Sequence, residues 1–466
     1  MSLAQSELVF IAPQREEGRL HLDVVLQALD RAYPPLLAAS QKVNAAQGNL
    51  LSAQGNFDVK VKAKGEYDPL GYYDAAKADL MIEQATPLWG LRVFGGYRYG
   101  SDFPIYAAKS VTGEAGEARV GLTLPLWRDG PIDAGRLGIR LAELGVDMAS
   151  LEFEMKRLEA YQKASKAYFK WVAAGLKLQI DRGMLRFAQA RQSFVERRVN
   201  QGALAAIELL DNRRLVVSRQ ERVATQEGEL ARATLNVSLF LRDTEGRVQR
   251  PGAESLPDTF PDVHTPSASL MRQAIAQGLD ARPELARLKQ VKKSLVAQLD
   301  FHENQRAPAV DLQVVASKDF GDKASYGPDP AFGTKGETEL GLSLSLAWPV
   351  QQRKARGKAA ATRAKLRQLE LERGFLSDAI EVQIRDAYAR LLAAQRRTTL
   401  AMEAYGLNRQ LEAAERRKLA LGQSTILVIN LREESTAKAA KELVDSLTTY
   451  HLARADLAVA SSQRPK

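Results

Sequence analysis

The stretch that decides the fold reads Val120-Gly121-Leu122-Thr123-Leu124-Pro125-Leu126-Trp127, and a second copy reads Leu340-Gly341-Leu342-Ser343-Leu344-Ser345-Leu346-Ala347. In both copies apolar residues alternate with small or polar ones, which indicates a strand with one apolar side. Each strand is followed by a long segment that contains no proline and is rich in strong helix formers. The sequence therefore predicts, twice, a strand that leads into long helices.

The two copies share one register. A spacing of 220 residues separates three matched features, a strand residue, an aromatic residue and a turn glycine: Val120 and Leu340, Tyr168 and Tyr388, and Gly202 and Gly422. Because these features match without a gap, we predict an internal two-fold repeat. Its first unit covers residues 1–243 and its second unit covers 268–466, with an irregular, proline-rich linker at 244–267.

The predicted elements follow the same order in both repeats. In the first we expect an upstream helix over about 20–54, strands within 57–127, a long helix at 133–200 and a helix at 203–241. In the second we expect a helix at 269–305, strands within 309–348, a long helix at 353–421 and a helix at 424–460. The first repeat also has an inserted segment at about 70–115, which is either an additional hairpin or one long loop. The fold class is mixed α+β, dominated by long helices.

The long helices constrain the architecture. About 68 residues at 1.5 Å each extend about 100 Å, which is too long for one face to be buried in the core of a single domain. Such a helix must lie along partners of equal length. In each repeat the upstream helix and the return helix together match that length.

Net charge and residue composition limit which partners and which chemistry the chain can be expected to have. The net charge of +10 fits either a nucleic acid or a membrane-associated surface as partner. A basic helical coiled coil, structural or nucleic-acid-binding, is the alternative interpretation, but alternating strands at equal positions in both halves count against it. Four scattered histidines and no cysteine give no catalytic, metal or cofactor motif, so we expect no enzyme and no cofactor.

One strand carries a candidate basic surface. Lys60, Lys62 and Lys64 share one side of a strand whose other side is apolar. In a membrane β-barrel the polar side faces the lumen, so these three lysines predict a basic lumen.

The whole pattern resembles the TolC-like outer-membrane efflux proteins. The resemblance rests on the duplication and on matching motifs in both halves, namely Pro34-Pro35-Leu36 and Pro283-Glu284-Leu285, the strand-to-helix junctions at 124–130 and 344–350, and the turn segments at 202–211 and 422–431. It implies a homotrimer with an outer-membrane β-barrel, usually of four strands per chain, and a periplasmic α-helical barrel. It also implies the exit duct of a tripartite efflux or type I secretion system, which exports substrates across the periplasm and outer membrane. The implied partners are a periplasmic adaptor protein, an inner-membrane pump of the RND, ABC or MFS type and outer-membrane lipid around the barrel, with no nucleic acid.

Two further expectations follow from the resemblance. The first residues lack the pattern of a secretory signal, so we expect a start from which the signal peptide is absent. At the periplasmic tip, Gly202 and Gly422 are expected in turns that contact the adaptor or form the gate. Glu208 and Asp211 occupy acidic positions there, whereas Val428 and Leu431 take their places in the second half. The aperture is therefore closed either by an acidic ring or by a hydrophobic constriction.

Overall fold

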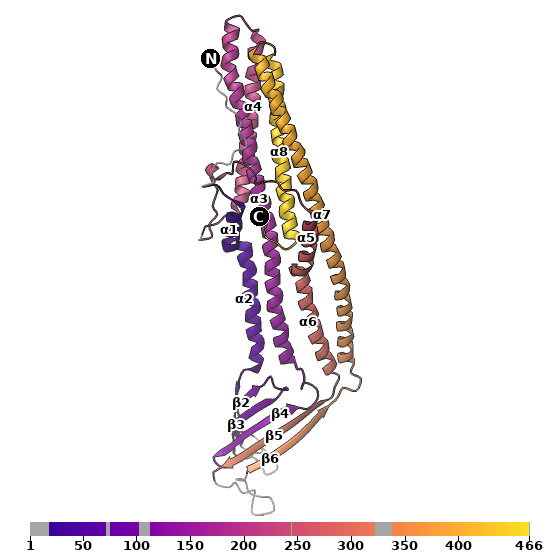
Figure 1. The fold of residues 1–466 in the computed structure, drawn as a ribbon. Helices are drawn as coiled ribbons and strands as arrows, with labels where there is room; N and C mark the ends of the chain where they lie inside the picture. Colours follow the sequence, from indigo (N-terminus) through magenta and orange to yellow (C-terminus); the bar gives the residue numbers. More distant parts are fainter. Residues whose placement is uncertain (1–17, 71–74, 102–111, 244, 322–337, 466) are drawn as a thin grey trace, which may run out of the picture. The chain divides into compact units, whose positions relative to one another are not determined.

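The computed structural model describes residues 18–70, 75–101, 112–243, 245–321 and 338–465. These residues form the following helices and strands (Figure 1): α1 (Leu22–Ala32), α2 (Pro34–Gln54), β1 (Lys60–Asp68), β2 (Ala75–Ala85), β3 (Arg92–Ser101), β4 (Gly116–Pro125), α3 (Ala134–Asn200), α4 (Ala206–Ser238), α5 (Ala268–Ala281), α6 (Pro283–Asn304), β5 (Ala309–Phe320), β6 (Thr338–Ala347), α7 (Arg353–Ala420) and α8 (Ile426–Ala460). The fold is mixed α and β and mostly helical. The expected signal-free start falls on residues 1–17, which lie outside the described residues.

The chain divides into two compact units. The helical unit comprises the described residues of 1–41, 151–286 and 374–466, and the sheet unit comprises those of 42–150 and 287–373. None of the described helices is long and apolar enough to cross a bilayer. The two predicted repeats, which divide the chain differently, stay a prediction.

Each of the two upstream stretches that were expected to form one helix forms two helices. The stretch expected as one helix over 20–54 is α1 and α2, and the stretch expected over 269–305 is α5 and α6. The residues between them, Tyr33 and Arg282, have extended backbones with ψ of 115° and 121°. Each precedes a proline, whose ring disfavours the helical conformation of the residue before it. The motifs Pro34-Pro35-Leu36 and Pro283-Glu284-Leu285 therefore mark helix starts.

The larger of two core clusters of the described helical unit lies along the middle of α3. Trp171 is 2% exposed there and donates its indole N–H to the Thr234 hydroxyl of α4 at 3.1 Å. Apolar residues of α1 (Val25, Leu26 and Leu29) belong to the same cluster. The predicted linker contributes Leu256 and Phe260 to it, so this irregular segment packs as part of the core.

The linker is also held by a buried histidine of α8. His451 is 1% exposed and is stacked between Phe169 and Phe260, with ring centroids 5.0 and 5.5 Å away. Its Nε2–H donates to the Pro261 carbonyl at 3.1 Å, whereas its Nδ1 has no hydrogen-bond partner in the described part of the chain. Burial, assisted by the nearby charge of Arg454, lowers the pKa of His451 to about 4.

Because His451 is buried in its neutral form, we expect the stability of the helical unit to fall in acid. The pKa of His451 is about 4 in the folded chain and about 6.5 when unfolded, so the unfolded state binds the proton first as pH falls. Stability is therefore lost between about pH 6.5 and pH 4, by about 2–3 kcal/mol at pH 4.5. Thermal unfolding followed by circular dichroism at pH 7 and pH 4.5 measures this loss. A His451→Phe variant keeps the stacking but cannot titrate, and should lose less stability between the two pH values; an equal loss would contradict the assignment.

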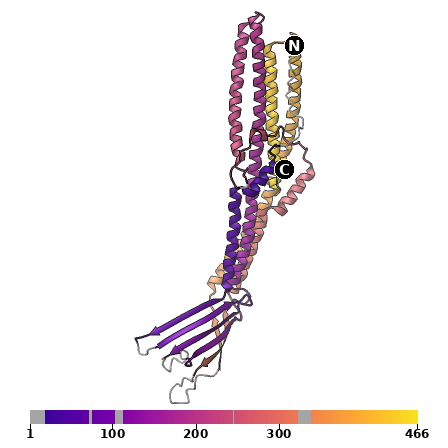
Figure 2. The same ribbon diagram turned by 90° about the vertical axis from the view of Figure 1, so that its left-hand side faces the viewer.

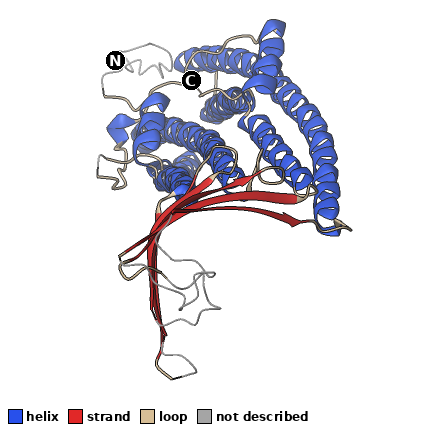
Figure 3. Ribbon diagram, turned by 90° about the horizontal axis from the view of Figure 1, so that it is seen from below, coloured by secondary structure: helices blue, strands red, loops and turns tan. Residues whose placement is uncertain are grey.

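The sheet unit contains one sheet of six strands in the order β1-β2-β3-β4-β5-β6. Every neighbouring pair is antiparallel. Figure 2 shows these strands from the side, and Figure 3 shows that the sheet is curved. The inserted segment of the first repeat contains β2 and β3, so of the two alternatives left open it forms an additional hairpin. Its expected parts at 71–74 and 102–111 lie outside the described residues.

Candidate functional site

The sheet has one apolar face in all six strands. Residues on this face are related through the strand registers, for example Val61 with Ile82 and Leu122 with Val314. Its large aliphatic side chains are between 50% and 70% exposed at Val61, Leu80, Ile82, Val120, Leu340, Leu342, Leu344 and Leu346. Among the described strand residues, Lys318 is the one charged residue on this face. An apolar surface of this extent needs a covering that the sheet unit itself does not provide.

The opposite face is charged. Its basic residues are Lys60, Lys62, Lys64, Lys77, Arg92, Arg98 and Arg119, and its acidic residues are Glu66, Asp68, Asp79, Glu83, Glu117, Asp311, Asp319 and Glu339. Seven positive and eight negative charges nearly cancel. A sheet with one apolar face and an opposite face that carries most of the charged residues is typical of a wall between lipid and water.

The three predicted lumen lysines lie on this charged face, but each has acidic neighbours. Lys62 Nζ lies 2.6 Å from Glu83 Oε2, Lys64 pairs with Glu66, and Lys60 is opposite Glu83 in the register. Lys62 and Lys64 also line a depression of about 180 Å³ together with Lys77 and Asp79. The basic lumen stays a prediction, and the local positive charge is partly neutralised.

The predicted turn glycines end the two long helices. Gly202 follows α3 with φ of 70°, and Gly422 follows α7 with φ of 73°. In both turns the residue after the glycine donates its N–H to the carbonyl five residues earlier, Ala203 to Arg198 at 2.8 Å and Gln423 to Lys418 at 2.9 Å. This bond satisfies a carbonyl that a helix end leaves free. Glycine is favoured because its backbone enters the left-handed region without a Cβ penalty.

The turn geometry gives a prediction with a matched control. Gly202→Ala is expected to lower the stability of the α3–α4 end by about 1 kcal/mol, because the left-handed conformation strains alanine. Gly228 lies within α4, and a Cβ has open space at both positions. Gly228→Ala should therefore raise stability by up to about 1 kcal/mol. Hydrogen exchange of the amides in α4 measures both; the same sign for both variants would contradict the turn assignment.

The other predicted tip residues lie in the first turns after these glycines. Glu208 is partly buried in the first turn of α4, and Asp211 is exposed and lies 3.6 Å from Arg214. In the second half, the Val428 N–H binds the Thr425 hydroxyl that caps α8, and Leu431 is 59% exposed. Both ends also expose aliphatic side chains, at Ile207, Leu210 and Leu427. The role of these residues in a gate or adaptor contact stays a prediction.

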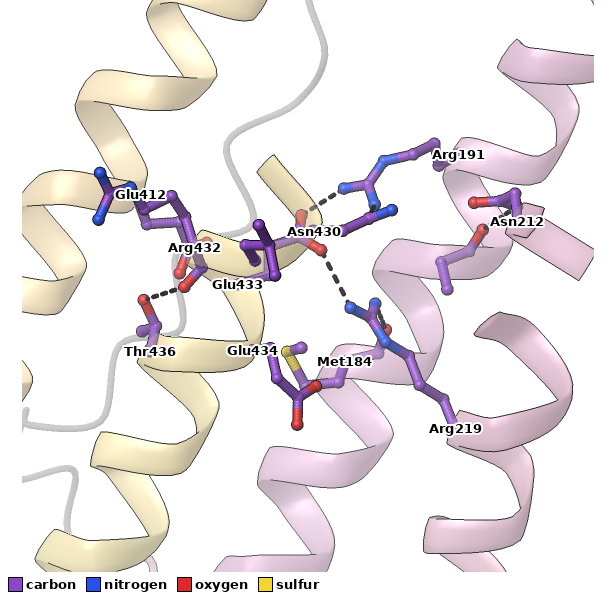
Figure 4. Close-up of polar contacts among 12 residues, drawn as sticks. Met184, Arg191, Asn212, Arg219, Glu412, Asn430, Arg432, Glu433, Glu434 and Thr436 are labelled. Atoms are coloured by element: carbon purple, nitrogen blue, oxygen red, sulfur yellow. Dashed lines mark hydrogen bonds and ion pairs between the residues drawn. The ribbon is translucent and has the colours of Figure 1, made fainter. Parts of the chain in front are cut away.

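A buried charge cluster lies further along the same helices (Figure 4). Glu433 of α8 is 1% exposed and binds three arginines, Arg191 of α3, Arg219 of α4 and Arg416 of α7. Arg219 Nη2 lies 3.3 Å from Glu433 Oε2, and Arg219 Nη1 donates to the Met184 carbonyl at 2.6 Å. Arg191 also donates to the Asn430 side chain. One carboxylate therefore links all four helices of this end of the helical unit.

Burial is the largest influence on the Arg219 guanidinium. It lowers the pKa of the Arg219 guanidinium, and the charge of Glu433 opposes that shift. Removing one partner of such a pair leaves the other charge buried without compensation. These residues could not be predicted from the sequence, because the helices contain many arginines and glutamates and no local pattern distinguishes a buried one from those on the surface.

Comparisons with known proteins agree on the class of protein. Residues 73–241 match the family described as Outer membrane efflux protein. No curated protein sequence matches the chain significantly. Among solved structures, the outer membrane protein VceC from Vibrio cholerae is 14% identical, with a TM-score of 0.65 over 96% of this chain and 97% of that one.

Two further channels share the fold. The open state of the MtrE outer membrane channel from Neisseria gonorrhoeae is 13% identical, with a TM-score of 0.63 over 96% of this chain and 89% of that chain. The CmeC outer membrane channel from Campylobacter jejuni is 11% identical, with a TM-score of 0.61 over 95% and 85%.

The matched segment and the shared fold both indicate similarity to outer-membrane channels. Residues 73–241 are similar to the outer membrane efflux proteins, and the TolC-like resemblance predicted from the sequence is confirmed.

Proposed function

We propose that three copies of this chain form an outer-membrane exit duct, whose sheets close a β-barrel in the outer membrane and whose long helices form an α-helical barrel in the periplasm. The duct receives substrates from an inner-membrane pump of the RND, ABC or MFS type through a periplasmic adaptor, and it catalyses no reaction. The single observation that carries the proposal is the sheet, with one exposed apolar face and one charged face in all six strands. Lipid covers the first face, and water fills the lumen along the second.

The ends of the long helices are the proposed contact with the adaptor and the proposed gate. Support comes from the two glycine turns and from the exposed aliphatic side chains beside them, including Ile207 and Leu427. The two halves differ, with Glu208 and Asp211 in one and Val428 and Leu431 in the other. Around the aperture of the assembled duct, helix ends with acidic residues then alternate with helix ends with apolar residues. The apolar residues can close the aperture by excluding water, and the acidic residues favour cations.

A mass measurement tests the proposal. Protein extracted from membranes should require detergent and should have three times the 51.3 kDa mass of one chain by native mass spectrometry. Heating in dodecyl sulfate should convert the trimer to monomer. A chain that leaves the membrane fraction without detergent and is monomeric would contradict the duct, and tight binding to DNA would favour the basic coiled-coil alternative.

A further inference from the structure

The described residues of the chain form more strands than the family resemblance implies. Resting on the proposed trimer, we infer that the assembled duct closes a barrel of eighteen strands, in which β6 of each chain pairs with β1 of the next copy. The resemblance alone implies four strands from each chain and therefore twelve. The inserted hairpin β2–β3 supplies the difference.

The inserted hairpin is integral to the sheet. β2 pairs with β1 from Lys60↔Glu83 to Asp68↔Ala75, and β3 pairs with β4 from Arg92↔Thr123 to Arg98↔Glu117. The hairpin also continues both faces, with Leu80 and Ile82 on the apolar face and Asp79 and Glu83 on the charged face. A hairpin lying on top of a four-stranded wall would instead need β1 to pair with β4.

Ion pairs of the charged face join the hairpin to β4. Arg98 of β3 lies 2.6 Å from Glu117 of β4, and these two side chains are 14% and 5% exposed. Arg119 of β4 lies 2.6 Å from Asp79 of β2, two strands away. Between them on β3 is Gly96, which has no side chain and leaves the path open. Removing the hairpin from the wall would leave Arg119 and Glu117 of β4 without these partners, which is costly for groups this well shielded from water.

The two edge strands of the described sheet, β1 and β6, each have one unpaired side. In the described part of the chain β1 and β6 each pair on one side only, and all residues of both strands are exposed. Free edges are normally protected by lysine, proline or a bulge, because unpaired backbone groups recruit other strands. β6 has neither lysine nor proline and carries four leucines, whereas β1 carries Lys60, Lys62 and Lys64, so the unprotected edge is that of β6. Because the strands alternate in direction and number six, the β6 of one copy meets the β1 of the next in antiparallel orientation.

The strand number sets the width of the duct in the membrane. Barrel diameter grows roughly linearly with strand number, so eighteen strands give a diameter about 1.5 times that of twelve at equal tilt. Barrels of this size leave an aqueous channel. The outer-membrane section should therefore admit solutes that a twelve-stranded duct excludes.

Cysteine pairs distinguish the two barrels, because the chain has no cysteine of its own. The test uses membrane-extracted protein and a short thiol cross-linker. Lys62→Cys with Met81→Cys, opposite each other on β1 and β2, should cross-link within a chain. Lys62→Cys paired in turn with Arg119→Cys, Gly121→Cys or Thr123→Cys on β4 should not, whereas one of these pairs should if the hairpin were excluded from the wall. Between chains, Lys62→Cys should form covalent trimers with one of Gly341→Cys, Ser343→Cys or Ser345→Cys. Leu342→Cys, on the other face of β6, is the control and should give none.

Strand counting by electron cryomicroscopy completes the test. A trimer with eighteen strands and the β1–β2 cross-link supports the inference. A trimer with twelve strands, or with a β1–β4 cross-link, overturns the inference and leaves the proposed duct standing. A protein that forms no trimer overturns the proposed function, and the inference with it.

Discussion

Replacing Glu433 by alanine is expected to destabilise the α3–α4–α7–α8 end of the helical unit by about 3–5 kcal/mol, because Arg219 is then left buried with its charge uncompensated. Arg219 is 2% exposed at its side chain, so water cannot replace the lost carboxylate. The amides of α4 and α8 near the cluster should then exchange with deuterium at least about 100-fold faster, since each 1.4 kcal/mol is a factor of ten.

The neighbouring glutamate provides a matched control. Glu434 lies 2.6 Å from Arg222, but both side chains are more than 40% exposed. Glu434→Ala should change stability by less than about 1 kcal/mol, because exposed ion pairs contribute little. The double variant Arg219→Met with Glu433→Leu removes both buried charges and should recover much of the loss. Equal effects of Glu433→Ala and Glu434→Ala would contradict the burial argument.

Leu344→Arg is expected to prevent assembly in the outer membrane. A charged residue on the lipid face of a barrel costs about 2–4 kcal/mol near the middle of the bilayer, and a trimer carries three copies of it. Leu344 is 66% exposed in the single chain, so the substitution removes little packing within the protein. The amount of trimer in the outer-membrane fraction should fall more than tenfold.

An arginine at the adjacent position 343 serves as the control, because it tests whether β6 tolerates arginine on its other face. Ser343 is on the charged face of the same strand, opposite Gln313. Ser343→Arg should leave the amount of trimer nearly unchanged. If both variants assembled equally well, the apolar face would not be in contact with lipid.

Short-range patterns predicted much of this fold. The period-two alternation at 340–347 is a property of neighbouring residues, and it predicts both faces of β6 without any tertiary contact. Gly202 and Gly422 were likewise predictable as turns, because a left-handed backbone favours glycine. The breaks before Pro34 and Pro283 were equally predictable from the residues themselves, yet helical composition on both sides suggested continuous helices.

Features that depend on distant contacts were not predictable. The sequence left the inserted segment undecided because Gly95 and Gly96 of β3 weaken its alternation, and pairing with β2 and β4 decides its structure. The Glu433 cluster needs four helices to meet at one carboxylate. The neutralisation of Lys62 by Glu83 depends on the strand register, which local patterns do not specify.

Alternate thiol labelling along β6 tests the central claim most directly. Single cysteines would replace Leu340, Gly341, Leu342, Ser343, Leu344 and Ser345 in the trimer embedded in lipid, against a background with no other cysteine. We expect a water-soluble maleimide to label the cysteines at 341, 343 and 345, and a lipid-soluble reagent to label those at 340, 342 and 344. Water-soluble labelling at all six positions would contradict a sheet with one face in lipid and the other lining a duct.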